Sequence, residues 1–326
     1  MEPGAVFKEF LGEVESGLLS QLGGETASEN DSLTAAARHL CLGGGAKRAR
    51  PVLVKVFGNT LGVKTPALVD AAIAAELIHS ASLLHDDVVD AGMYRRGRPT
   101  VNARWGNIVA VMSGDLLLSG ALLRLSQVNL RLTQTALETV AEMTKAAIHE
   151  VEVRGNLELS FEDLARVAEG KTGSLFGWCG KAAAILAGVP EAEGRFDAFG
   201  RRIGVAFQMA DDIRDVTGTD EGKPPFADIA SKSPSLPLLL AARRDPALLR
   251  RLKEAWAYTA MTPERVKELG TAVLCSGVVD EAIERMTVEI DAAVDALGPY
   301  AQSSHGAELV GWARKLAIGI ALKGAA

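Results

Sequence analysis

The chain has 326 residues, a net charge of −6 and a pI of about 5.5. A nucleic-acid-binding protein is usually basic, so we expect no nucleic-acid partner. Hydrophobic residues make up 48% of the chain and aromatic residues only 5%, a bias that favours helices over strands. With no linker-like stretch, the sequence predicts one all-α domain, a single-domain helical bundle over residues 1–326.

The spacing of apolar residues predicts the helices in chain order. In the first half they cover residues 5–22, 32–42 and 52–61, then a stretch from Pro66 to an acidic cluster, then 109–127 and 133–153. In the second half they cover 161–169, 172–187, 191–216, 238–243, 247–259, 263–274, 278–297 and 308–322. Residues 91–99 are predicted as an arginine-bearing loop. The Gly- and Pro-rich stretch 218–237 is too long for a simple turn, which suggests a functional loop.

The cysteines and the apolar segments indicate where the protein resides. Cys41, Cys179 and Cys275 are far apart and lack metal-ligand spacing, which fits a reducing compartment. The first ten residues contain no apolar signal-peptide core, and the apolar run 108–118 is too short to span a bilayer. We therefore expect a cytoplasmic protein with at most peripheral membrane contact.

Two acidic clusters in apolar, helix-periodic stretches share the form Asp-Asp-x-x-Asp. Their aspartates are Asp86, Asp87 and Asp90 in one, and Asp211, Asp212 and Asp215 in the other. A helix brings positions i and i+4 onto one face, and like charges at that spacing destabilise it, so a cation is expected there. Carboxylates without nearby His or Cys suit Mg²⁺ carrying a phosphate or diphosphate. One cluster alone could equally be a solvated helix face, but two matching clusters favour metal binding.

The glycine-rich stretch 43–51 supplies cations for such an anion. Lys47, Arg48 and Arg50 stand beside flexible glycines, and Pro51 suits the first turn of the coming helix. A helix N-terminus adds positive potential, although the stretch lacks the spacing of a Walker loop. A solvated basic loop is the alternative interpretation.

Three further residues lie near the first acidic cluster. Arg95 and Arg96 follow it, and could bind phosphate as well as neutralise the aspartates, since the two roles are compatible. His79 precedes Asp86 by two helical turns on the same face, where a structural and a functional role are both open.

Together these residues resemble the trans-isoprenyl (polyprenyl) diphosphate synthase family. Its two aspartate-rich motifs look like residues 83–90, followed by the Arg-Arg-Gly-Arg-Pro-Thr of 95–100, and residues 207–215. Its Gly-Gly-x-Lys-Arg-x-Arg-Pro element matches residues 44–51, and its Gly-Asp and Lys-Thr pairs match residues 114–115 and 171–172. The matches keep the family order from about residue 40 to residue 240.

The resemblance implies a role for each matching residue. The six aspartates would be catalytic ligands of Mg²⁺ bridging to an allylic diphosphate, with Lys171 also catalytic. The allylic diphosphate would be bound by Arg95, Lys171, Thr172, Gln208 and Lys223, and isopentenyl diphosphate by Lys47, Arg50, His79 and Arg96. The implied fold is an all-α bundle around a deep central cavity, usually a homodimer.

The implied reaction is head-to-tail prenyl transfer through an allylic carbocation, giving an all-trans polyprenyl diphosphate. Product length should depend on the residues one turn before the first aspartate motif. In farnesyl-type members an aromatic residue commonly closes the first of these positions, whereas Ala81 and Ser82 are small here. We therefore predict geranylgeranyl diphosphate or a longer product.

The chain departs from the family pattern after the second motif. Phe226 replaces a glycine of the usual Gly-Lys-x-x-Gly-x-Asp, and Ser233 stands where a lysine is expected, with Lys232 one place early. Two alternatives stay open. A class I terpene cyclase usually lacks the second Asp-Asp-x-x-Asp motif, and a regulatory subunit of a hetero-oligomeric synthase tends to lose aspartates that this chain keeps.

Overall fold

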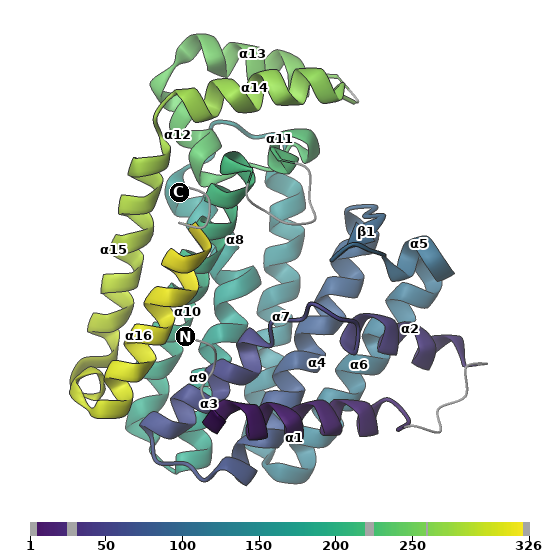
Figure 1. Ribbon diagram of the computed structural model, residues 1–326, viewed down its shortest axis with the longest axis vertical. Coiled ribbons are helices and arrows are strands. Elements are labelled where there is room, and N and C mark those ends of the chain that lie inside the picture. The colour runs from purple at the N-terminus through teal and green to yellow at the C-terminus, as the bar shows by residue number, and fades with distance from the viewer. Residues whose placement is uncertain (1–4, 25–30, 219–224, 259, 322–326) are drawn as a thin grey trace. The chain divides into compact units, whose positions relative to one another are not determined.

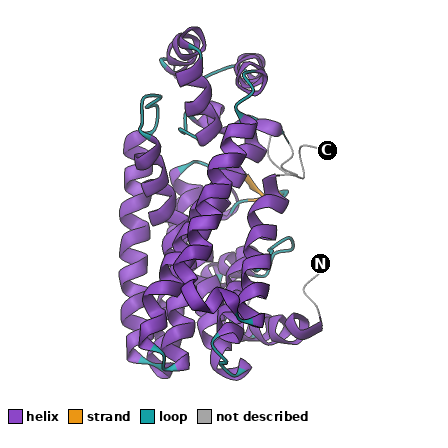
Figure 2. Cartoon of the chain, turned by 90° about the vertical axis from the view of Figure 1, so that its left-hand side faces the viewer, coloured by secondary structure: helices purple, strands orange, loops and turns teal. Residues whose placement is uncertain are grey.

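The computed structural model describes residues 5–24, 31–218, 225–258 and 260–321. The described chain is almost wholly helical, which confirms the predicted all-α class (Figure 2). Its one small sheet is an antiparallel hairpin of β1 (Tyr94–Arg95) and β2 (Arg98–Pro99), within the stretch predicted as a loop. Arg96 and Gly97 form the tip with positive φ angles of 52° and 72°.

The chain divides into two compact units. The first comprises the described residues of Met1–Val140 and Trp178–Asp197, and the second those of Ala141–Gly177 and Ala198–Ala326. The boundaries fall within three helices, α7 (Leu130–Val153), α9 (Ser174–Ala187) and α10 (Pro190–Thr217). A single domain over the whole chain remains a prediction.

The first unit is built around α4, which packs along α3 and α6 (Figure 1). The elements that lie wholly in this unit are α1 (Ala5–Gln21), α2 (Ser32–Cys41), α3 (Ala49–Thr60), α4 (Thr65–Val89), the hairpin, α5 (Val101–Trp105) and α6 (Asn107–Val128). The alanine-rich face of α4 is fully buried, and the side chain of Leu68 fills the space above Gly58 of α3. Small residues therefore let these helices approach closely.

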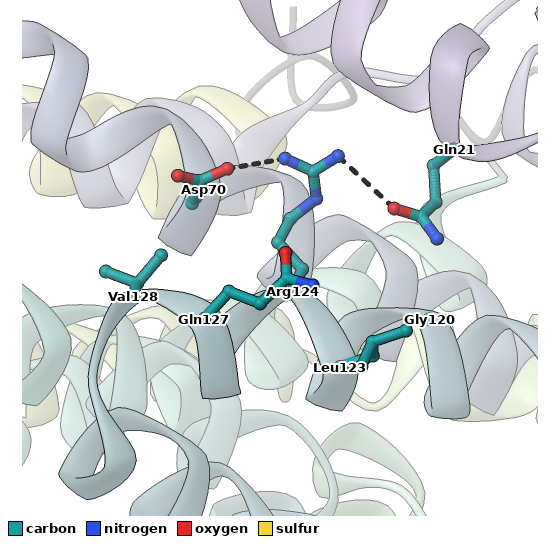
Figure 3. A pocket seen from close by; sticks show the side chains of 7 residues that line it. All are labelled: Gln21, Asp70, Gly120, Leu123, Arg124, Gln127 and Val128. Carbon is teal, nitrogen blue, oxygen red and sulfur yellow. Dashed lines mark hydrogen bonds and ion pairs between the residues drawn. The ribbon is translucent and has the colours of Figure 1, made fainter.

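Arg124 joins three helices of this unit at a polar hollow of about 320 Å³ (Figure 3). From α6, its guanidinium donates to Asp70 of α4 at 2.5 Å and to Gln21 of α1 at 3.2 Å. The hollow contains none of the residues singled out in the sequence, so we assign it to structure.

The second unit contains residues 141–153 of α7, 174–177 of α9 and 198–217 of α10, together with several whole elements. The whole elements are α8 (Phe161–Ala168), the π-helix η1 (Glu169–Gly173), α11 (Ala227–Ser231), α12 (Leu236–Arg244), α13 (Pro246–Trp256), α14 (Pro263–Cys275), α15 (Val279–Leu297), the 3₁₀-helix η2 (Gly298–Gln302) and α16 (Ser304–Ala321). α13 packs beside α14, and α15 beside α16 (Figure 1).

The predicted break between helices 161–169 and 172–187 is wrong. η1 joins α8 to α9 without a gap, and its glycines serve close packing rather than helix termination. A β-carbon on Gly173 would lie 2.6 Å from the carbonyl oxygen of Arg201, and one on Gly170 would lie 2.6 Å from the β-carbon of Ala146. A π-helical turn inside an α-helix often marks a functional site.

Other helix boundaries differ by a few residues. α3 begins at Ala49 and α16 at Ser304, each earlier than predicted, and α5, α11 and η2 were not predicted. These short elements depend on caps and tertiary contacts, because they are too short to show an apolar period. Thr100, for example, accepts a hydrogen bond from the amide of Ala103 at the start of α5.

α4 and α6 are long and apolar enough to cross a membrane, judged by length and composition alone. The apolar run predicted as too short to span is thus part of a 22-residue helix, α6. The most apolar window of α4 is 67% buried inside the protein, against 33% for α6. α4 is therefore a core helix, whereas α6 presents an apolar face.

Candidate active site

The first acidic cluster ends helix α4. Asp86 and Asp87 lie in its last turns, and Asp90 is the C-cap residue, whose amide donates to the carbonyl of Asp86 at 2.8 Å. The i, i+4 relationship predicted for Asp86 and Asp90 is therefore retained. Asp87 is buried and Asp90 is exposed. The C-terminus of a helix carries partial negative charge, so this position strengthens the demand for a cation.

Arg95 supplies part of that positive charge from the hairpin. Its guanidinium donates to both carboxylate oxygens of Asp87, with distances of 2.8 to 3.0 Å. This two-pronged geometry is the strong form of an arginine–carboxylate pair. Of the two roles considered for Arg95, the structure shows neutralisation of Asp87.

His79 stands among the arginines of this region. Burial lowers the pKa of His79 well below its ordinary value, and the positive charges of Arg50, Arg96 and Arg95 lower it further. His79 is thus neutral near pH 7 and can donate a hydrogen bond without adding charge. The structure brings together three of the four residues expected to bind isopentenyl diphosphate, and the concentration of arginines fits an anion. The fourth, Lys47, is exposed.

Arg48 has a structural role that sequence reasoning missed. It is buried, adopts a left-handed φ of 49°, and donates to Glu76 and to the carbonyl of Cys41, each at 2.6 Å. It also pairs with Glu15 at 2.6 Å. Arg48 therefore anchors the glycine-rich stretch that carries Lys47 and Arg50. In the sequence, Arg48 stood out only as one of the cationic residues of the glycine-rich stretch, which did not predict its structural role.

The second acidic cluster lies near the C-terminus of α10. Asp212 is buried and receives hydrogen bonds from the side-chain amide of Gln208 at 3.2 Å and from the backbone amide of Leu236 at 3.0 Å. Thr172 in η1 donates to the other end of the Gln208 side chain at 3.4 Å. The chain of contacts from Thr172 through Gln208 to Asp212 joins three of the predicted site residues.

Burial raises the pKa of Asp212 to about 7, and the neighbouring carboxylates of Asp211 and Asp215 also raise it. The hydrogen bonds from Leu236 and Gln208 offset only part of this effect. The cluster therefore holds more negative charge than its protein surroundings stabilise, which is the condition that a bound cation would relieve.

The remaining acids of the cluster have different partners. Asp211 contacts Arg214 at 3.4 Å, one turn along the helix. Both oxygens of Asp215 accept backbone hydrogen bonds, from Ala227 at 2.8 Å and from Asp228 at 3.2 Å. The side chain of Asp215, which belongs to α10, thus binds the first amides of α11, whereas Asp212 lines a cavity.

That cavity has a volume of about 560 Å³ and lies wholly within the second unit. Its lining includes the polar side chains of Lys171, Gln208 and Asp212, with apolar side chains that include Leu164, Val167 and Met209. Lys171 is in η1 and pairs with Glu150 of α7 at 2.5 Å. The lining also holds Glu150, Glu162 and Glu289, so an anionic head would need bound cations there, while the largely apolar wall suits a hydrocarbon tail.

The donor set fits Mg²⁺ better than a metal held by protein alone. Within the parts of the chain that the structure describes, no group of three or more His, Cys, Asp or Glu residues could hold a metal by itself. Mg²⁺ commonly uses only one or two carboxylates and completes its shell with water and substrate phosphates. Oxygen-only ligands and the raised pKa of Asp212 agree with that mode of binding.

The other predicted positions have clear surroundings. Ala81 is buried, and Ser82 donates its hydroxyl to the carbonyl of His79 at 2.8 Å. Lys232 does not replace the lysine expected at 233, because its ammonium group donates to the carbonyls of Trp256 and Tyr258 at 2.8 and 2.5 Å. Ser233 does line the cavity. Lys223 lies outside the described residues.

Comparison with known proteins decides the family. The family model described as Polyprenyl synthetase matches residues 30–273. The chain belongs to the polyprenyl synthetase family. Component 2 of heptaprenyl diphosphate synthase from Geobacillus stearothermophilus is 35% identical over 280 residues, 85% of each chain. Octaprenyl diphosphate synthase from Haemophilus influenzae is 32% identical over 271 residues, 82% of each chain.

Solved structures agree with this assignment. A polyprenyl synthase from Caulobacter crescentus, complexed with calcium and isoprenyl diphosphate, has a TM-score of 0.88 at 25% identity and covers 97% of this chain and 95% of its own. A decaprenyl diphosphate synthase from Rhodobacter capsulatus has a TM-score of 0.87 at 25% identity and covers 97% of both chains. This polyprenyl synthetase is therefore a prenyltransferase of the isoprenoid synthase fold that elongates prenyl chains, as the motifs predicted.

Proposed function

We propose that the enzyme joins an allylic diphosphate to isopentenyl diphosphate, head to tail, with Mg²⁺ bound by the two aspartate clusters. The observation that carries this proposal is the buried, under-neutralised Asp212 beside an amphipathic cavity. That the six aspartates of both clusters act on the same diphosphate is part of the proposal, as the family resemblance implies. The calcium and isoprenyl diphosphate bound by the Caulobacter relative support it.

The residues divide the work by their chemistry. Bound Mg²⁺ would stabilise the negative charge of the departing diphosphate. Lys171, Thr172 and Gln208 hold the allylic diphosphate beside Asp212. The hydrogen bonds from Thr172 to Gln208 and from Gln208 to Asp212 orient two of these side chains before substrate arrives. The arginines around His79 bind isopentenyl diphosphate. The apolar wall keeps water from the allylic cation. With no better-placed side chain evident, released diphosphate is the base that removes the proton.

We further propose that the product is longer than farnesyl diphosphate and is a long polyprenyl diphosphate. The position at which an aromatic side chain would stop the growing chain is Ala81, a buried small residue of α4. Three of the relatives, named heptaprenyl, octaprenyl and decaprenyl diphosphate synthase, support a long product, whereas a mycobacterial relative of 34% identity is named farnesyl diphosphate synthase. Geranylgeranyl diphosphate is the lower bound of this proposal.

Product analysis tests both parts. The purified chain is incubated with Mg²⁺, labelled isopentenyl diphosphate and, in separate reactions, geranyl, farnesyl or geranylgeranyl diphosphate, and the products are sized by chromatography. Elongated all-trans products that disappear with a chelator support the proposal. Products formed from an allylic diphosphate alone would indicate a terpene cyclase instead.

A second candidate is that the chain is one component of a two-component synthase. The Geobacillus relative is named component 2 of such an enzyme, which supports this second candidate. All six aspartates are present, so within such a complex this chain would be the component that carries the aspartate clusters. Turnover by the purified chain alone would exclude an obligatory second component, and its absence would favour one.

If the chain does not need a different second component, we propose that its partner is a second copy of itself. α6 exposes Ile108, Met112, Leu116 and Leu123 at helical spacing, a continuous apolar stripe on the first unit. Such a stripe needs cover, and an identical stripe covers it symmetrically. Sedimentation of the purified chain should give a homodimer, and a monomer at micromolar concentration would overturn this part. A cytoplasmic location stays part of the proposal.

A further inference from the structure

Phe226 has a conformation that its residue type disfavours. Its φ is 65°, in the left-handed region, and its side chain is only 7% exposed. The sequence comparison above placed a glycine at this position in the family pattern, and glycine adopts such a φ without strain. An aromatic residue held there must be stabilised by its surroundings.

The surroundings are those of Gly270 in α14. The ring of Phe226 occupies the space that a β-carbon on Gly270 would need. The absence of a side chain at Gly270 therefore makes room for the ring. The short helix α11 begins immediately after Phe226. Two more contacts fix α11, since the indole of Trp256 donates to the carbonyl of Ile229 at 3.1 Å and Lys232 donates to two carbonyls at the end of α13.

The helix fixed in this way holds one acid of the second cluster. The amide of Phe226 donates to the carbonyl of Asp215 at 3.0 Å, and the next two amides donate to its two carboxylate oxygens at 2.8 and 3.2 Å. The two amide bonds, one to each carboxylate oxygen, therefore fix the orientation of the Asp215 side chain.

We propose that Phe226, seated on Gly270, is a positioning residue that orients Asp215 toward the cation of the second cluster. The inference rests on the proposed role of that cluster in binding Mg²⁺. Groups that orient a metal-binding carboxylate commonly change metal affinity 10- to 100-fold when they are lost. The departures at Phe226 and Lys232 therefore form a chain-specific support for the cluster.

The test uses variants on both sides of the contact. Gly270→Ala places a methyl group in the space of the ring, and Phe226→Leu removes the ring while keeping a β-carbon. Leu269→Ala is the matched control, because it empties a buried position in the same helix without filling the space of the ring. Asp215→Asn removes the ligand itself.

Two readouts separate positioning from general loss of stability. The first is hydrogen exchange at the amides of residues 227 and 228 in the metal-free protein, which should accelerate in Gly270→Ala and Phe226→Leu but stay slow in Leu269→Ala. The second is the Mg²⁺ concentration that half-saturates stabilisation of the full chain by inorganic diphosphate in thermal melts. It should rise about tenfold in both variants and in Asp215→Asn, and stay unchanged in the control.

The decisive comparison is the double variant. If Phe226 acts through Asp215, adding Asp215→Asn to Gly270→Ala produces no further increase in the Mg²⁺ requirement. Multiplying effects would overturn the inference. Asp212→Asn tests the proposed function separately. If the Mg²⁺ requirement of Asp212→Asn is unchanged, the cation role of the whole cluster is contradicted. If it rises in Asp212→Asn but is unchanged in Gly270→Ala, only the inference about Phe226 is contradicted.

Discussion

The guanidinium of Arg48 lies 2.6 Å from a carboxylate oxygen of Glu76, and both side chains are buried. This pair ties the start of α3 to the middle of α4 in the first unit. The basic residues proposed for isopentenyl diphosphate stand on the same two helices or beside them. This buried ion pair therefore fixes the two helices that carry residues proposed to bind isopentenyl diphosphate.

Replacing Arg48 with methionine should destabilise the protein strongly. The variant leaves Glu76 buried without its partner, which costs about 3–5 kcal/mol of unfolding free energy. Denaturant unfolding followed by circular dichroism measures the loss. Lys47→Met is the control, because Lys47 is exposed and its loss should change stability by less than about 0.5 kcal/mol. Equal midpoints for the two variants would contradict the assignment of Arg48.

His79 should make stability depend on pH. Folding lowers the pKa of His79, mainly through burial and secondly through nearby arginines. Below about pH 6.5, His79 is therefore protonated in the unfolded chain while it stays neutral in the folded protein. Stability from this group is present above that pH and falls as the pH drops below it, by at most about 1.4 kcal/mol per pH unit. His79→Gln should flatten the decline between pH 7 and 5. An unchanged slope would show that His79 is not held neutral.

Gly173→Ala tests the close contact beneath η1. The added β-carbon would lie 2.6 Å from the carbonyl oxygen of Arg201, so η1 must shift, and Thr172 with it. We expect a fall in kcat/KM of about tenfold or more, measured by steady-state assay, with a stability loss of about 1–3 kcal/mol. Gly194→Ala in α10 is the control, since open space surrounds it and alanine favours helix by about 1 kcal/mol. Equal activity in both variants would argue against the role of η1.

The helices were largely predictable because apolar spacing records which face of each helix is buried. The long helices α4, α6, α10 and α15 lie within a few residues of the predicted ranges. The π-helix was not predictable, since Gly170 lay in the predicted break between two helices, whereas it serves packing in the structure. Short α5 and α11 depend on caps and contacts that have no local period.

The site was predictable where motifs fix residue identity, as in the aspartate clusters and in the Lys171-Thr172 pair. Hydrogen-bond partners were not, because they are set by tertiary contacts. Lys232 donates hydrogen bonds to the carbonyls of Trp256 and Tyr258, and Asp215 accepts one from the amide of Ala227. These partners are more than ten residues away along the chain. Arg48 shows the same limit, since its sequence neighbours suggest anion binding and its tertiary partners are acids.

Ala81→Tyr should shorten the product. If the growing chain extends past Ala81, as we propose, tyrosine at this buried position of α4 would block it, and the longest product should fall toward farnesyl diphosphate. Ala81→Val is the graded control and should shorten the product less. Chromatography of dephosphorylated products gives the lengths. An unchanged distribution with tyrosine would mean that the floor lies elsewhere.

The most direct test of the central claim, that both aspartate clusters bind one diphosphate through Mg²⁺, is calorimetric binding of an unreactive allylic diphosphate analogue. Wild-type protein should bind it only with Mg²⁺ present. Asp86→Asn and Asp212→Asn should each weaken that binding at least tenfold, although the two residues belong to different units. Full Mg²⁺-dependent affinity in either variant would contradict a site shared by the two clusters.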